Sequence, residues 1–284
     1  MNDFNSKFVT LYDNGTTLPF TAGGVTQDGE NKGRGARNNQ DAACLLINNG
    51  MIIAVVCDGC GGASPYGLNR YSFNETGAQL LAAISLEETR KLIEAGANAD
   101  TIVERLEISL TDKLEKLLEL LGGGRERYLL EMLCATILVG VVTNDYWCLL
   151  HCGDGLIGYN GSVQDLGDYS GVYLANKLMD KNSQSLFHVA ASGDTKDLLN
   201  ILVASDGVLD LTGEGGSLVT MLNTPDNRAY PYGYDGKMGF TREFRRRVGR
   251  KTAARGDSHD DRTLIMIRRV NHASIERGID CGHQ

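Results

Sequence analysis

The sequence of 284 residues contains no apolar run long enough to cross a bilayer. Its N-terminus lacks the charged and apolar regions of a secretory signal. It also lacks a basic excess, because the formal net charge at pH 7 is -8, whereas a general nucleic-acid-binding protein needs a basic surface. These absences predict a cytoplasmic protein that binds neither membranes nor nucleic acids, and we expect it to be a monomer.

The seven cysteines lack the pattern of a disulfide framework. Their number is odd, and Cys44, Cys134 and Cys148 lie in apolar runs, as reduced core cysteines do. Cys57 and Cys60 have the spacing of a redox or zinc pair, but no second such pair and no paired histidines accompany them. A redox or zinc protein built on these two cysteines is an open interpretation with little support.

The composition is that of a soluble globular protein, with 42% hydrophobic and 23% charged residues. Neither a linker nor an internal repeat divides the chain, so we expect one domain at 21–270. A loose N-terminal arm at 1–20 precedes it, and a C-terminal tail at 271–284 follows it.

Apolar runs and turn residues predict an α+β fold. The predicted strands are 44–47, 51–57, 135–142, 146–152, 156–163, 186–190, 201–204 and 264–267, with hairpin turns at Asn49-Gly50 and Asn160-Gly161. The predicted helices are 67–84, 86–121 with a break near Gly96, and 240–250, and 211–239 is a long loop. Strands joined by hairpins, with helices grouped together, indicate antiparallel sheets covered by helices.

Four short acidic turns each adjoin an apolar strand. Asp41 and the pair Asp260-Asp261 precede strands, whereas Asp58 and Asp206 follow strands. One Asp-Gly alone is only a turn signal, but four carboxylates that converge at strand ends repel one another unless a cation binds. Oxygen ligands favour Mg²⁺ or Mn²⁺, and two such ions roughly 3.5–4 Å apart can activate a water and clamp a phosphoryl group.

Five motifs occur in a fixed order along the chain. They are Asn39-Gln40-Asp41, Asp58-Gly59-Cys60-Gly61-Gly62, Gly153-Asp154-Gly155, Ser205-Asp206-Gly207-Val208-Leu209-Asp210 and Asp260-Asp261-Arg262-Thr263. In order, strand context and spacing they resemble the motifs of the type 2C metal-dependent serine/threonine protein phosphatases (the PPM family), in a divergent bacterial-type branch. The resemblance runs from about residue 33 to residue 268.

The resemblance implies a set of metal-binding residues. Asp41, Asp58, Asp206 and Asp260 would hold two core Mn²⁺ or Mg²⁺ ions, with Asp58 bridging them and the Gly59 carbonyl completing one coordination sphere. Asp154 and Asp210, together with Asp206, match a weaker third-metal site. Thr136 matches a threonine of the strand that precedes the Gly153-Asp154-Gly155 motif.

The resemblance also implies a fold and an activity. The fold would be two antiparallel β-sheets packed face to face and flanked by α-helices on both sides, a four-layer αββα sandwich with the metals at one end. The activity would be hydrolysis of phosphomonoesters by a metal-activated water. The substrate would be a phosphoserine or phosphothreonine protein, such as a kinase or the target of one.

Several positions depart from the family pattern. The phosphate-binding arginine usually lies five residues before the first aspartate, where this chain has Ala36; Arg37 is one residue closer, and Arg34 is farther away. We assign Arg37 to the phosphate, with a surface arginine as the alternative. Cys60 replaces a methionine or histidine, and Gly155 replaces a serine.

Two further departures concern the end of the pattern and the substrate flap. Asp261 replaces an asparagine, so Asp260 is our choice of ligand. The short segment between Asp154 and Asp206 leaves little room for a flap that grips the substrate. The predicted loop at 211–239 is an alternative candidate for that flap, or has no such role. The misplaced arginine keeps a second interpretation open, a catalytically weak or silent relative that works as a regulatory or binding module.

Overall fold

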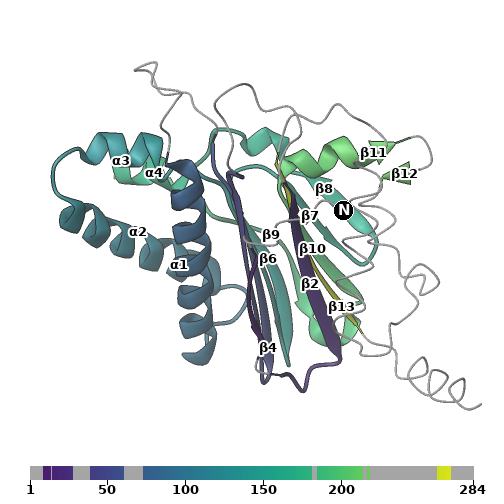
Figure 1. The fold of residues 1–284 in the computed structure, drawn as a ribbon. Coiled ribbons are helices and arrows are strands. Elements are labelled where there is room, and N and C mark those ends of the chain that lie inside the picture. The colour runs from purple at the N-terminus through teal and green to yellow at the C-terminus, as the bar shows by residue number, and fades with distance from the viewer. Residues whose placement is uncertain are drawn as a thin grey trace, which may run out of the picture.

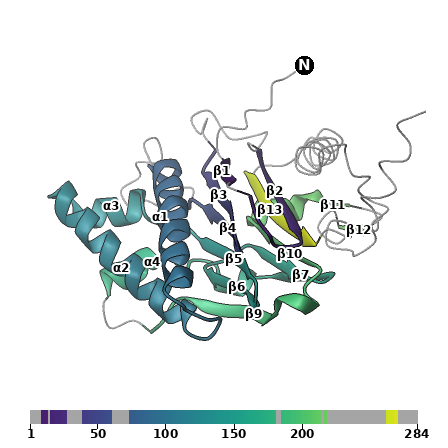
Figure 2. The same ribbon diagram turned by 90° about the horizontal axis from the view of Figure 1, so that it is seen from below.

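Two β-sheets packed face to face make up the centre of the computed structural model (Figure 1). The structure describes residues 9–13, 15–27, 39–60, 73–180, 184–213, 216–217 and 261–269. The helices of this part of the chain lie on the outer face of one sheet (Figure 2). None of them is long and apolar enough to cross a membrane.

The first sheet has six strands. In order across the sheet they are β1 (Val9–Asp13), β3 (Asp41–Asn48), β4 (Met51–Asp58), β5 (Ile137–Thr143), β6 (Tyr146–Cys152) and β9 (His188–Asp194). Neighbouring strands are antiparallel, except that β1 pairs with β3 in parallel at the edge. Strand β1 lies in the segment that we expected to be a loose arm, so that arm is not irregular throughout.

The second sheet has five strands, all antiparallel. In order across the sheet they are β2 (Phe20–Gln27), β13 (Arg262–Arg269), β10 (Asn200–Ala204), β7 (Leu156–Tyr159) and β8 (Ser162–Asp165). A separate small ribbon joins β11 (Thr212–Gly213) to β12 (Gly216–Ser217). The five antiparallel strands in each sheet confirm the predicted α+β sandwich.

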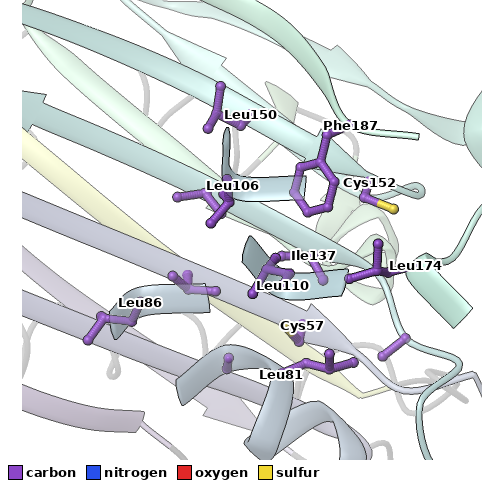
Figure 3. Packing of buried hydrophobic residues seen from close by; sticks show 14 of the residues in the cluster. Cys57, Leu81, Leu86, Leu106, Leu110, Ile137, Leu150, Cys152, Leu174 and Phe187 are labelled. Atoms are coloured by element: carbon purple, nitrogen blue, oxygen red, sulfur yellow. The ribbon is translucent and has the colours of Figure 1, made fainter. Parts of the chain in front are cut away.

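Four α-helices of the described residues cover the first sheet. They are α1 (Asn74–Glu94), α2 (Ile102–Leu121), α3 (Arg125–Glu131) and α4 (Leu174–Met179). Their buried side chains form one apolar cluster with this sheet, and Leu81, Leu106, Leu110, Ile137 and Phe187 are among its members (Figure 3). The predicted helix at 240–250, the candidate for the fourth layer, lies outside the described residues.

The central strands are apolar without alternation because both of their faces are buried. In β4, Ile53 and Val55 pack toward the helices, whereas Ile52, Ala54 and Val56 pack toward the second sheet. Successive side chains of a strand point to opposite faces, so a strand between two apolar layers needs apolar residues at every position. A charged residue at the end of such a strand is held rigidly by its apolar neighbours.

Three 3₁₀ turns complete the described elements: η1 (Gly167–Tyr169), η2 (Thr195–Asp197) and η3 (Asp206–Leu211). Both predicted hairpin turns are present, with positive φ at Gly50, Asn160 and Gly161. The predicted division between helices near residue 85 is wrong, because α1 continues through Ser85 to Glu94. The chain there has no glycine or proline to end a helix, and the break comes near Gly96, as predicted, with a φ of +80°.

Candidate metal centre at one end of the sandwich

Asp41 and Asp58 are direct cross-strand partners. Asp41 is the first residue of β3, Asp58 is the last residue of β4, and the register of the β3–β4 hairpin places them opposite each other. By the alternation of each strand both side chains point to the face between the two sheets. Directly opposed like charges destabilise a sheet, with Cβ atoms about 4.5–5.5 Å apart, so this pair calls for a positive partner.

Ser205 connects this pair to the second sheet. Ser205 follows β10, and its Oγ donates a hydrogen bond to Asp41 Oδ2 at 2.7 Å. The same Oγ accepts a hydrogen bond from the amide of Thr263 at 2.9 Å. The other carboxylate oxygen, Asp41 Oδ1, is buried and has no hydrogen-bond partner in the described part of the chain. A buried carboxylate oxygen without a donor fits a cation ligand.

The electrostatics of Asp41 reflect this crowding. Burial, followed by the negative charge of Asp261, raises the pKa of Asp41 to about 7, against the opposing effect of hydrogen bonds from Ser205 and Thr263. The charged form of a carboxyl group with such a pKa is unfavourable near neutral pH unless a cation lies beside it. The residues present therefore fit a hard divalent cation.

Asp261 holds the start of β13 against the start of β3. Its Oδ2 accepts a hydrogen bond from the amide of Gln40 at 2.6 Å, and its side chain is buried. An asparagine at this position, as in the family pattern, offers the same acceptor without the charge. The neighbouring Asp260, which we assigned as the ligand, lies outside the described residues.

A buried polar network fixes the same corner. Asn39 Nδ2 donates to Thr26 Oγ1 at 2.7 Å, and this hydroxyl also shares a 2.6 Å hydrogen bond with the hydroxyl of Thr263. The Oδ1 atom of Asn39 accepts a hydrogen bond from the amide of Asp41 at 2.9 Å. The network joins β2, β3 and β13, so the position of Asp41 depends on both sheets.

Gly59 cannot be replaced by a residue with a side chain at this backbone position. A Cβ atom there would lie 2.9 Å from the carbonyl oxygens of both Gln40 and Asn74. The amide of Gly59 donates to the Gln40 carbonyl at 3.1 Å, and the amide of Asp58 donates to Thr136 Oγ1 at 3.1 Å. The predicted threonine therefore positions the backbone of Asp58.

The turn that carries Asp154 lies at the same end of the sandwich. It follows β6, whose last residue, Cys152, pairs with Ile137 next to the end of β4. Gly153 and Gly155 have φ values of +98° and +127°, which only glycine adopts readily. Asp154 is half-buried between them.

The remaining predicted ligands are described only in part. Asp206 is the first residue of η3, directly after Ser205, and η3 also contains Asp210, whose side chain is not described. Arg34, Arg37 and Asp260 lie outside the described residues. Within the part that the structure describes, no three or more His, Cys, Asp or Glu side chains gather in a geometry able to hold a metal. The structure thus brings together Asp41 and Asp58, with Asp206 adjoining through Ser205.

The redox or zinc interpretation based on Cys57 and Cys60 finds no support. Cys57 is fully buried in the apolar cluster under the helices, and burial raises the pKa of its thiol well above the ordinary value. A cysteine binds zinc as the thiolate, so a Cys57 thiol with a raised pKa does not fit a zinc ligand, and its complete burial keeps reagents in solvent away from it. The described cysteines are all free.

A family model described as protein phosphatase 2C matches residues 29–241 of the sequence. The chain belongs to the protein phosphatase 2C family. The matched segment contains Asp41, Asp58, Asp154 and Asp206 and ends before Asp260. No curated protein matches the sequence of this phosphatase 2C chain.

Solved structures agree with the family at the level of the fold. A bacterial serine phosphatase aligns with a TM-score of 0.56 and 15% identity, covering 87% of this chain and 97% of the other. A sex-determining protein of C. elegans aligns with a TM-score of 0.55 and 14% identity over 87% and 64% of the two chains. PppA, a regulatory component of T6SS in Pseudomonas aeruginosa, aligns with a TM-score of 0.50 and 16% identity over 88% and 97%.

The sequence reasoning missed the polar residues that support the aspartates of this phosphatase 2C fold. No role was predicted from the sequence for Ser205, Thr26 or Thr263, although Ser205 and Thr263 lie within the five motifs. The signal for Ser205 was its place between an apolar strand and Asp206. Nothing in the sequence indicates that its hydroxyl reaches Asp41, because that contact joins residues 164 positions apart.

Proposed function

We propose that this chain is a metal-dependent protein serine/threonine phosphatase that uses Mn²⁺ or Mg²⁺. One observation carries the proposal: the cross-strand pair Asp41 and Asp58 lies between the sheets, and Ser205 ties it to the turn that carries Asp206. Such a pair is costly without a cation and is supported from both sheets. We take the type of reaction from the family and the location of the active site from this pair of aspartates.

The proposed roles follow from these positions. Asp41, Asp58, Asp206 and Asp260 would hold two ions, with Asp58 shared between them and the Gly59 carbonyl as a further ligand. Asp154 and Asp210 would hold a third ion together with Asp206. When bound, the ions supply an activated water and neutralise the charge that develops during in-line displacement at phosphorus. Arg37 binds the phosphate.

The chain's own hydrogen bonds prepare this site. Ser205 holds Asp41 Oδ2 and leaves Oδ1 for a ligand. Thr136 Oγ1 accepts a hydrogen bond from the amide of Asp58. The amide of Cys60, which shares a peptide plane with the Gly59 carbonyl, donates to the Cys134 carbonyl and so orients the Gly59 carbonyl. Ligands fixed in this way need little rearrangement when the cation binds, which favours affinity.

The proposed substrate is a phosphoserine or phosphothreonine protein, such as a kinase or its target, and the proposed state is a cytoplasmic monomer. A phosphothreonine peptide and p-nitrophenyl phosphate test the reaction without knowledge of that target. Asp112, exposed on α2 and not among the proposed ligands, offers a matched control for loss of an aspartate.

The test is hydrolysis of both substrates with Mn²⁺, Mg²⁺ or EDTA. We expect metal-dependent turnover that EDTA abolishes, a loss on the order of 100-fold or more in Asp206→Asn, and no loss in Asp112→Asn. A folded protein without turnover under either metal would reject the enzyme and favour the silent regulatory module. Equal losses in both variants would reject the proposed site.

A further inference from the structure

Cys60 and Cys134 are cross-strand neighbours beside the candidate metal centre. Gly59 forms a bridge with Ala135, and the amide of Cys60 donates to the Cys134 carbonyl at 2.9 Å. On the other side of the bridge, the amide of Thr136 donates to the Asp58 carbonyl at 2.9 Å. The β4–β5 ladder therefore continues past the strand ends and sets Cys60 opposite Cys134.

This arrangement places two thiols within reach of each other. Opposed residues of an antiparallel ladder have Cα atoms about 4.5–5.5 Å apart, inside the range of about 4.4–6.8 Å found in disulfides. Side chains of opposed residues share one face, and both cysteines contact the apolar cluster under the helices. Burial, followed by repulsion from the charged form of Cys60, raises the pKa of Cys134 to about 11.

The two thiols differ in exposure. Cys60 is half-buried, whereas Cys134 is buried with 8% of its surface exposed. The other described cysteines are Cys44, Cys57, Cys148 and Cys152, all buried. Cys60 is thus the described cysteine most open to a reagent from solvent, and Cys134 lies where a resolving thiol belongs.

We propose that Cys60 and Cys134 are a peroxide-sensitive pair that forms a reversible disulfide. The Cys60 sulfur attacks hydrogen peroxide, the O–O bond breaks, and a sulfenic acid and one water result. The Cys134 thiol then attacks that sulfur, so an S–S bond forms, the S–O bond breaks and a second water leaves. Two thiols lose two electrons and two protons, and one peroxide becomes two waters.

The disulfide acts on the metal centre, an inference that rests on the proposed function. Disulfide Cβ atoms lie about 3.5–4.5 Å apart, closer than those of ordinary opposed residues, so the bond draws the two segments together. Gly59 has no room to follow, because it is packed against the carbonyls of Gln40 and Asn74. The displacement reaches Gln40, the residue before Asp41, through the hydrogen bond from Gly59.

The test oxidises the reduced full chain with hydrogen peroxide and maps its disulfides by mass spectrometry without reduction. We expect a Cys60–Cys134 linked peptide that dithiothreitol removes. Cys134→Ala loses this peptide, whereas the matched control Cys148→Ala, which removes a buried cysteine of β6, keeps it. A link from Cys60 to Cys57 instead, or no link in a folded protein, would overturn the proposal.

Activity gives a separate result. We expect Mn²⁺-dependent hydrolysis by the wild type to fall about tenfold on oxidation, because displacing residues that position metal ligands weakens metal binding or activity. Dithiothreitol should restore the activity. The Cys134→Ala variant should keep its activity through the same treatment. Full activity in a protein shown to carry the link would overturn the effect on the metal centre. A reduced protein without activity would reject the proposed phosphatase, while the mass spectrum would still decide the disulfide.

Discussion

At the scale of single residues, Asp41 carries a strong electrostatic signature within the candidate site. Its carboxyl group is buried, and its pKa is raised to about 7, first by burial and then by the charge of Asp261. In the unfolded chain the same group titrates near its ordinary value of 3.8. The folded, metal-free protein therefore binds a proton between these two values that the unfolded protein does not bind.

The sign of the resulting pH dependence follows directly. The unfolding free energy falls with rising pH wherever the native state binds more protons than the unfolded state. Asp41 therefore lowers the unfolding free energy most above pH 7 and least below its unfolded pKa. Each pKa unit corresponds to about 1.4 kcal/mol. Between about pH 8 and about pH 5.5, Asp41 should thus add about 2 kcal/mol to the unfolding free energy of the metal-free protein.

Urea denaturation in EDTA at the two pH values measures this effect. Asp41→Asn cannot titrate, so the gain on acidification should be smaller in this variant than in the wild type by the stated amount. Asp112→Asn, exposed on α2, should behave as the wild type. If wild type and Asp41→Asn changed in parallel, the buried carboxyl would not be the titrating group.

At the scale of the elements, Gly77 sets how closely α1 approaches the segment before β5. A Cβ atom at Gly77 would overlap the backbone carbonyl of Met132, so the helix and this segment touch backbone to backbone. Met132 lies four residues before Thr136, which positions Asp58. The packing of α1 therefore supports the metal centre from outside the sheet.

Gly77→Ala separates packing from helix propensity. Propensity alone predicts that alanine stabilises a helix by up to about 1 kcal/mol over glycine. The overlap with Met132 predicts the opposite sign, a loss of at least about 2 kcal/mol in unfolding free energy, because backbone cannot move aside as a side chain can. Urea denaturation decides between them.

Gly123→Ala is the matched control, because nothing lies within 4 Å of a Cβ atom there. It should change the unfolding free energy by less than about 0.5 kcal/mol. A stabilising Gly77→Ala would mean that α1 lies farther from the Met132 segment than described.

The elements also show how far the sequence determines the site. The turn Asn49-Gly50 fixes the register of β3 against β4, so the pairing of Asp41 with Asp58 follows from the hairpin. Contacts between sheets do not follow, because the bond from Ser205 to Asp41 depends on how two sheets pack. The helix boundary near Ser85 was misplaced because periodicity marks buried faces better than ends, and only Gly96 gave a stop signal.

At the scale of the whole molecule, the proposed ligands come from both sheets. Asp41 and Asp58 end strands of the first sheet, whereas Asp206 follows β10 of the second. A cation held by all three would link the two layers at one end, where Ser205 and the Asn39–Thr26–Thr263 network already join them. Metal binding should therefore stabilise the complete sandwich and not one hairpin.

Thermal unfolding with increasing Mn²⁺ tests this link. A ligand that binds only the folded state at 100 times its Kd adds about 2.7 kcal/mol, which raises the Tm of a domain of this size by several degrees. Asp206→Asn should lose most of this rise, although it leaves Asp41 and Asp58 intact, because the link needs the second sheet. Asp112→Asn should keep it. If Mn²⁺ raised the Tm of Asp206→Asn as much as that of the wild type, the ions would bind the first sheet alone, and the two layers would be joined only by their buried polar network.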